Sequence, residues 1–90
     1  MDNIKIKITS PEEVIWEGKA EALSSKNSQG PFDILPGHAN FITLIKNETI
    51  VVRKKAKDIK FKFERSVLFN RNNEVIIYIT PYMEFLKDKK

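Results

Sequence analysis

Short apolar runs separated by turn-forming residues constrain the fold of this chain more than any other feature. Ile4, Ile6 and Ile8 alternate with polar residues, and the segment 59–63 does the same with Ile and Phe. Alternation with a period of two is typical of strands that have one buried and one solvated face. About eight to ten such runs follow at short spacing without a long amphipathic helix, which predicts a β-sandwich or a barrel.

Residues 30–45 form the most distinctive stretch. Pro36-Gly37 favours a tight turn between two strands, because proline fixes φ and glycine accepts a positive φ. The only histidine, His38, follows this turn, where we expect it to brace the turn through a hydrogen bond. Residues 41–45 are apolar at nearly every position, which predicts a strand buried on both faces, or buried on one and docked to a partner on the other.

Three further segments carry local predictions. A strand over 14–18 is expected to bend or bulge at Gly18 before a third strand over 19–25. The phase of the alternation slips near Arg65 and Ser66, which indicates a bulge or a change of sheet. Asn residues at 70–73 favour a hairpin turn.

The last apolar segments suggest a partner surface and a short helical turn. Residues 75–79 are all apolar or aromatic, and they cannot all face one small core, so Ile76 and Tyr78 are candidates for a partner surface. Tyr82, Phe85 and Leu86 have the spacing of one helical turn that folds back onto the sandwich.

Length and composition limit the possible classes of protein. Ninety residues predict a single domain over 1–90 with one thin core. The chain has no Cys and one His, so disulfide scaffolds, thiolate zinc sites and cysteine nucleophiles are excluded and a metal site is not expected. No apolar run reaches the roughly 20 residues that span a bilayer. We therefore expect a soluble, intracellular protein.

Positive charge is concentrated in the second half of the sequence. Residues 1–45 contain four basic and six acidic residues, whereas residues 46–90 contain twelve and six. A stand-alone basic β module that binds nucleic acid or anionic lipid headgroups through 46–71 is one interpretation. The alternative is that these lysines keep strand edges soluble. In the segment 60–63, Lys and Phe alternate and so face opposite ways, which argues against a groove for single-stranded nucleic acid.

No group of residues predicts catalysis. His38 has only Asp33 and Thr43 as nearby candidate partners, and the glycines form no phosphate-binding loop. We expect no catalytic, cofactor-binding or metal-binding residue and no cofactor, and the chain is not predicted to be an enzyme.

Two segments resemble one known family. Residues 30–43, with Gly30, Phe32 and Ile34-Leu35-Pro36-Gly37-His38-Ala39 followed by Phe41-Ile42-Thr43, resemble the signature loop of the N-terminal β-sandwich of the ATP synthase epsilon subunit, the equivalent of the mitochondrial delta subunit. The opening residues 9–21 and the segment 72–79 are similar to that family's first and last strands in the same order. The resemblance covers about residues 3–81.

The resemblance implies an antiparallel sandwich of about ten strands in the central stalk of an F-type ATP synthase. Its implied role is to couple the gamma subunit to the c-ring during ATP synthesis driven by protons or sodium ions. It implies a monomer within the complex, without nucleic acid, that reaches the membrane only through the c-ring, at the cytoplasmic face of a bacterial plasma membrane. The implied c-ring contacts are Ser28, Gln29, Gly30, Pro31, Phe32 and His38, and the gamma contacts, which rest partly on the apolar pattern, are Phe41, Thr43, Ile45, Ile76 and Tyr78.

The sequence departs from the family's pattern in ways that alter these expectations. The family commonly has an acidic residue at the position of Pro31, so an ionic contact to the c-ring from there is not expected. The family's C-terminal helical hairpin is expected to be missing, because the sequence ends nine residues after Pro81. We therefore expect neither the inhibition of ATP hydrolysis nor the regulatory ATP site that the family places in that hairpin.

Overall fold

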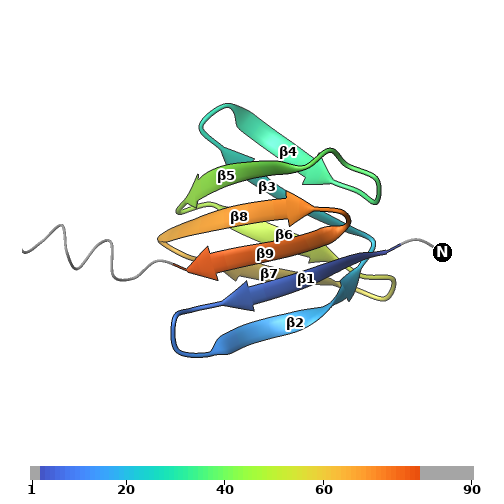
Figure 1. The fold of residues 1–90 in the computed structure, drawn as a ribbon, viewed down its shortest axis with the longest axis horizontal. Helices are drawn as coiled ribbons and strands as arrows, with labels where there is room; N and C mark the ends of the chain where they lie inside the picture. Colours follow the sequence, from blue (N-terminus) through green and yellow to red (C-terminus); the bar gives the residue numbers. More distant parts are fainter. Residues whose placement is uncertain (1–2, 80–90) are drawn as a thin grey trace, which may run out of the picture.

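The computed structural model describes residues 3–79, and these residues form nine strands in two sheets packed face to face (Figure 1). The strands are β1 (Ile4–Thr9), β2 (Val14–Ala20), β3 (Ala22–Asn27), β4 (Gly30–Ile34), β5 (Phe41–Lys46), β6 (Thr49–Arg53), β7 (Asp58–Lys62), β8 (Arg65–Arg71) and β9 (Glu74–Ile79). The first sheet has the order β2-β1-β9-β8-β5 and the second β4-β3-β6-β7. The predicted β-sandwich is confirmed, and the helical turn expected at 82–86 lies outside the described residues.

The core lies between the two sheets and follows the predicted alternation. Ile4, Ile6 and Ile8 of β1 all point inward and are fully or almost fully buried. The register continues this inner layer across the sheet, since Ile8 lies beside Ile77 of β9, which lies beside Leu68 of β8. The second sheet contributes the other half of the core through Leu23, Ile34, Ile50 and Val52.

One strand pair departs from the antiparallel pattern. β1 and β9 pair in parallel, with Ile6 beside Val75, whereas the other paired strands are antiparallel. The first and last strands of the described chain thus lie side by side in the middle of the first sheet (Figure 1). This pairing places the outward-facing side chains of β1 next to those of β9.

The bend predicted at Gly18 is wrong. β2 continues through Gly18 to Ala20, and the chain turns at Glu21 before β3. A Cβ atom at Gly18 would lie 2.9 Å from the indole ring of Trp16, so glycine is needed there for close packing of that ring. The expected third strand accordingly begins at Ala22.

The predicted turns and the change of sheet are confirmed. In the turn at 35–38, His38 N–H donates to the Leu35 carbonyl oxygen at 3.0 Å, and Gly37 has a φ of 87°. Asn72 and Asn73 have φ values of 52° and 64° in the turn between β8 and β9. The slip in phase near Arg65 corresponds to the passage from β7 in the second sheet to β8 in the first.

Aromatic pairs close both open sides of the sandwich. On the side of the edge strands β2 and β7, the rings of Trp16 and Phe61 lie 6.1 Å apart. On the side of β4 and β5, Phe32 and Phe41 meet edge to face at 5.7 Å. These contacts connect the two sheets at their edges, where buried side chains alone would leave the core open. Within residues 3–79, no helix is long and apolar enough to cross a membrane.

Candidate protein-binding surface

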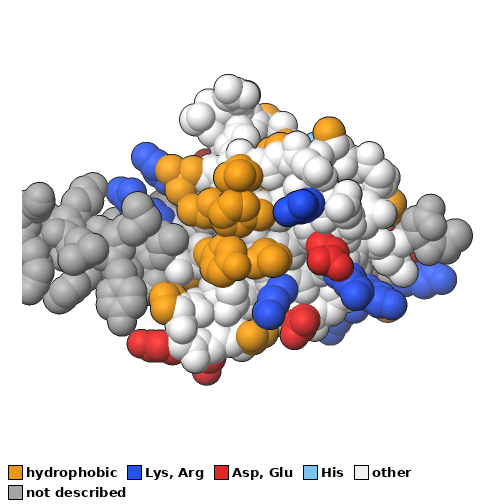
Figure 2. All heavy atoms as spheres, in the orientation of Figure 1, with side chains coloured by type: hydrophobic (Ala, Val, Ile, Leu, Met, Phe, Trp, Pro, Cys, Tyr) orange, Lys and Arg blue, Asp and Glu red, His pale blue; other side chains and the backbone are white. Residues whose placement is uncertain are grey.

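The outer face of the first sheet carries a cluster of apolar side chains. β-strand register aligns Ile42, Phe69 and Ile76 in one row across β5, β8 and β9, and Leu44, Val67 and Tyr78 in the next. Figure 2 shows hydrophobic side chains gathered on the face that carries β5, β8 and β9 in Figure 1. We call this set the apolar patch: Ile42, Leu44, Val67, Phe69, Ile76 and Tyr78.

Several side chains of the apolar patch are widely exposed to solvent. Ile42 is 65% exposed, and Tyr78 and Leu44 are 44% and 42% exposed. Phe69 lies edge to face with Tyr78 at 5.6 Å, so the patch is packed within itself but is not covered. A solvated sheet face usually carries polar side chains at these positions. A contiguous apolar cluster of this kind is typical of a surface that binds another protein.

The residues predicted to contact a partner from β5 and β9 fall on two different faces. Ile76 and Tyr78 belong to the apolar patch. Phe41, Thr43 and Ile45 point toward the second sheet, and Ile45 is fully buried in the core. Pairing with β8 decides which residues of β5 face inward, because it places Ile45 beside the buried Ser66. The accessible apolar residues of β5 are therefore Ile42 and Leu44.

Sequence reasoning missed four members of the apolar patch. Ile42 and Leu44 lie in a strand that is apolar at nearly every position, so alternation could not tell its faces apart. Residues 67–69 are all apolar, so the sequence does not show which of them faces outward, and in the structure Leu68 is the buried one. The inner face of β8 carries Ser66, Leu68 and Asn70. Because two of these three buried residues are polar, the sequence does not mark this face as the buried one.

The second predicted contact group extends over the length of β4. Ser28 and Gln29 form the turn before β4, and Phe32 lies in the strand, whereas His38 lies in the loop beyond the other end of β4 (Figure 1). The structure brings Phe32 and His38 together through Phe41, whose ring centroid lies 5.7 Å from that of Phe32 and 5.0 Å from that of His38. A partner that touches Ser28 and His38 must therefore extend along the β4 and β5 side.

The histidine loop is fixed by its neighbours. The Gly37 N–H group donates to Asn73 Oδ1 at 2.8 Å, and Asn72 N–H donates to Asn40 Oδ1 at 3.0 Å. Asn70 Nδ2 donates to the Ala39 carbonyl oxygen at 2.9 Å. These bonds hold residues 37–40 against Asn70 of β8 and the turn between β8 and β9, so the loop is positioned by residues far away in the sequence.

The three side chains considered for catalysis, those of His38, Asp33 and Thr43, each contact a different partner. His38 Nδ1 lies 2.7 Å from the Ala39 carbonyl oxygen. Asp33 Oδ1 accepts a hydrogen bond from Ser24 Oγ at 2.6 Å, and Thr43 Oγ1 accepts one from Asn27 Nδ2 at 2.9 Å. In the described part of the chain, no group of three or more His, Cys, Asp or Glu residues could hold a metal ion.

The interleaved lysines and phenylalanines separate as predicted. Phe61 packs against the core beside Ile50, whereas Lys60 and Lys62 are exposed on the outer face of the second sheet. Phe63 stacks on Phe61 at 6.1 Å between ring centroids. Rings and charges in this segment therefore do not line one groove.

Comparison with known proteins gives the same family by a family model and by similar sequences. The model of the family described as ATP synthase, Delta/Epsilon chain, beta-sandwich domain matches residues 3–81. The chain is 31% identical over 74 residues to the ATP synthase epsilon chain of Clostridium novyi, covering 81% of this chain and 56% of that one. It is 32% identical over 75 residues to that of Clostridium kluyveri, covering 82% and 57%. The chain thus spans little more than half the length of these curated relatives.

Solved structures show the same fold. A chain in the cryo-EM structure of Euglena gracilis mitochondrial ATP synthase, OSCP/F1/c-ring in rotational state 1, matches with a TM-score of 0.78 and 15% identity, covering 96% of this chain and 61% of that chain. A chain in the Tetrahymena thermophila mitochondrial ATP synthase central stalk/c-ring structure matches with a TM-score of 0.65 and 9% identity, covering 87% and 63%. At these identities, the likeness shows the fold alone.

Proposed function

This chain belongs to the ATP synthase delta/epsilon chain family, matching its β-sandwich domain, and we propose that it is a non-catalytic central-stalk component of an F-type ATP synthase. In this role it binds the gamma subunit and the c-ring and makes them turn as one body. The solved relatives belong to F1/c-ring and central stalk/c-ring structures, which supports this position in the complex. Either protons or sodium ions would drive the synthesis of ATP.

The apolar patch is the observation that carries this proposal. Covering it removes apolar area from water, which is favourable by about 25 cal/mol per Å². Phe69 lies on β8, the middle strand of the patch, between Ile42 of β5 and Ile76 of β9, and its ring packs edge to face with Tyr78. Aromatic anchors within a packed apolar centre are typical of residues that dominate binding energy. We assign the gamma contact to this patch.

The fold suits a coupling role because its parts are tightly joined. Hydrogen bonds hold residues 37–40 against β8 and the turn between β8 and β9. These bonds stiffen this end of the sandwich. Thr43 of β5 also accepts a hydrogen bond from Asn27 of β3, which connects the two sheets. A body that transmits torque must resist deformation between its two contacts, and these bonds stiffen it.

The c-ring contact is proposed on the side formed by β4 and β5. The predicted residues Ser28, Gln29, Gly30, Pro31, Phe32 and His38 lie along this side, from the turn before β4 to the loop after it. Contact with the c-ring would hold the chain at the cytoplasmic face of the membrane without any segment of its own entering the bilayer.

Co-purification tests the proposed function. The full chain is incubated with purified gamma subunit and with detergent-solubilised c-ring of the same organism, at low and moderate salt. Gamma should co-purify at both salt concentrations, because an interface with an apolar centre resists screening. If a folded, β-rich chain binds neither partner, the proposal is wrong. Binding to anionic vesicles or single-stranded DNA would then favour the basic-module alternative.

A further inference from the structure

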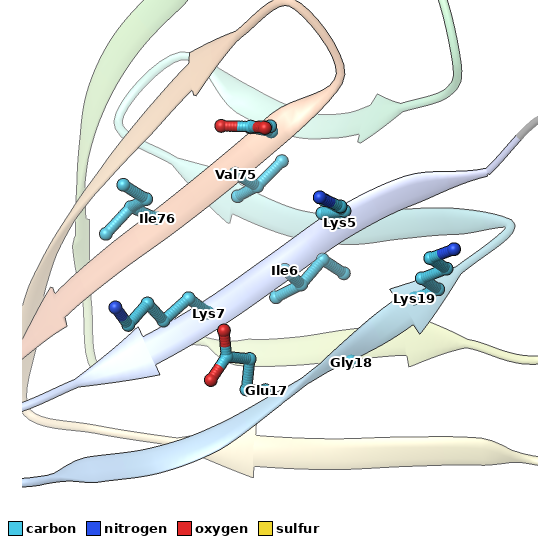
Figure 3. Close-up of a pocket in the computed structure, with 9 residues that line it drawn as sticks. Lys5, Ile6, Lys7, Glu17, Gly18, Lys19, Val75 and Ile76 are labelled. Atoms are coloured by element: carbon cyan, nitrogen blue, oxygen red, sulfur yellow. The ribbon is translucent and has the colours of Figure 1, made fainter.

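Three open hollows follow one another across the outer face of the first sheet, each sharing lining residues with the next, and we call this series the trough. The first is lined by residues of β1, β2 and β9, including Lys7, Glu74 and Ile76 (Figure 3). The second shares Glu74 and Ile76 with it and extends to Phe69 and Arg71 of β8. The third shares Phe69 and Arg71 and reaches Ile42 of β5. The trough therefore crosses the five strands of this sheet rather than following any one of them.

The two ends of the trough differ in chemistry. One row across the strands carries Ile42, Phe69 and Ile76 of the apolar patch over β5, β8 and β9, and it continues to Lys7 on β1 and Glu17 on β2. Basic side chains lie on the remaining part: Lys5 and Lys7 on β1, Lys19 on β2 and Arg71 at the end of β8. Figure 3 shows Lys5 and Lys7 on β1 and Lys19 on β2, and Lys7 lies beside Ile76 of β9. The acidic residues along the trough are Glu17 and Glu74, so positive charge predominates.

We propose that this trough binds an amphipathic α-helix of the gamma subunit whose apolar stripe is followed, toward one end of the helix, by Asp or Glu. The apolar stripe would lie on Ile42, Phe69 and Ile76, and the acidic end would lie over Lys7 and Lys19 on β1 and β2. Five strands spaced about 4.8 Å apart give a trough of about 19 Å, which matches a helix of about 13 residues at 1.5 Å per residue. The inference rests on the proposed function in naming gamma as the source of the helix.

The direction of the trough favours a helix over a strand. A strand added by β-augmentation pairs with the edge of a sheet, and the edges here are β2 and β5. The trough instead passes over β1, β9 and β8 in the interior of the sheet, whose backbone groups are already paired. An occupant of this surface must satisfy its own backbone hydrogen bonds, as a helix does.

Charge argues against two other occupants. The segment 80–90 of this chain has apolar residues, but it carries three lysines against Glu84 and Asp88, so it has no excess of acidic side chains to face the basic end of the trough. A second copy of the chain would bring together two surfaces of the same sign. Like charges facing each other across an interface are unfavourable, so an acidic partner fits better than either.

Charge reversal in the trough tests this inference. The double variant Lys7→Glu/Lys19→Glu is compared with Lys60→Glu/Lys62→Glu, which makes the same charge change on the outer face of the second sheet. We expect the first variant to bind purified gamma at least about tenfold more weakly, because attraction becomes repulsion, and the second to bind like the wild type. The neutral variant Lys7→Gln/Lys19→Gln should lose less affinity, and thermal unfolding checks that each variant is folded.

A second measurement separates this inference from the proposed function. The ¹⁵N-labelled full chain is titrated with a helical peptide of about 14 residues that carries a Leu stripe and Glu residues at one end, and with a matched peptide that has Lys in place of Glu. Amide shifts confined to the strands of the first sheet, with the Glu peptide only, would support the trough even if gamma does not bind. Equal binding of both peptides overturns it. If gamma binds wild type and both reversed variants equally, the proposed function stands and the trough inference is wrong.

Discussion

At the scale of single residues, Gly18 shows how a small side chain allows a large one to pack. The Trp16 ring lies where a Cβ atom of residue 18 would be, at 2.9 Å. We expect Gly18→Ala to lower the free energy of unfolding by about 1–3 kcal/mol, because the ring must leave its position against Phe61. Urea denaturation measures this, with Glu17→Ala, at an exposed position of the same strand, as the control. An unchanged midpoint would contradict the packing role.

Asn73 combines two local roles that substitutions can separate. Its φ of 64° lies in the left-handed region, and its Oδ1 atom accepts the Gly37 N–H hydrogen bond. Asn73→Ala should destabilise the protein by about 1–3 kcal/mol, since it loses the bond and strains the turn. Asn73→Gly should cost less than Asn73→Ala, because glycine keeps the turn and loses only the bond. Thermal or urea unfolding of both variants checks the order, and equal losses would argue against backbone strain.

At the scale of elements, the two faces of β5 differ in burial, because one faces the core and the other faces solvent. Ile45 is fully buried, whereas Ile42 is 65% exposed, although both are isoleucines of one strand. We expect Ile45→Ala to lower the free energy of unfolding by about 2–5 kcal/mol, and Ile42→Ala by less than about 1 kcal/mol. Urea denaturation of the two variants makes the comparison, in which each serves as the control for the other. If Ile42→Ala were more destabilising than Ile45→Ala, the assignment of inward-facing and outward-facing residues in β5 would be wrong.

At the scale of the whole molecule, the two sheets depend on one shared core. The chain passes repeatedly between them, so neither sheet consists of a continuous segment. We expect a single cooperative unfolding transition, because loss of one sheet exposes the inner face of the other.

Two probes test this cooperativity. Fluorescence of Trp16, which lies on the β2 and β7 side, and far-ultraviolet circular dichroism should give coincident urea curves. A separate earlier transition by fluorescence would show that this side of the sandwich opens independently of the remaining strands.

Local residue chemistry was sufficient to predict much of the architecture. Alternation in residues 59–63 predicted which side chains face the core, because successive side chains of a strand point to opposite sides. Pro36-Gly37 and the asparagines at 72 and 73 predicted turns through their backbone preferences. The apolar character of residues 75–79 predicted an exposed apolar row on β9. The contacts with gamma and the c-ring remain predictions.

The amino-acid sequence by itself determined the strands, the turns and the class of fold, since these follow from properties of neighbouring residues. Only the tertiary structure decided the parallel pairing of β1 with β9, the phase of β5 and the assembly of the trough. An apolar run such as residues 41–45 has no polar position to mark its outer face, so its phase is set by its register with β8. Ile42, Phe69 and Ile76 form one row only because three strands distant in sequence are hydrogen-bonded side by side.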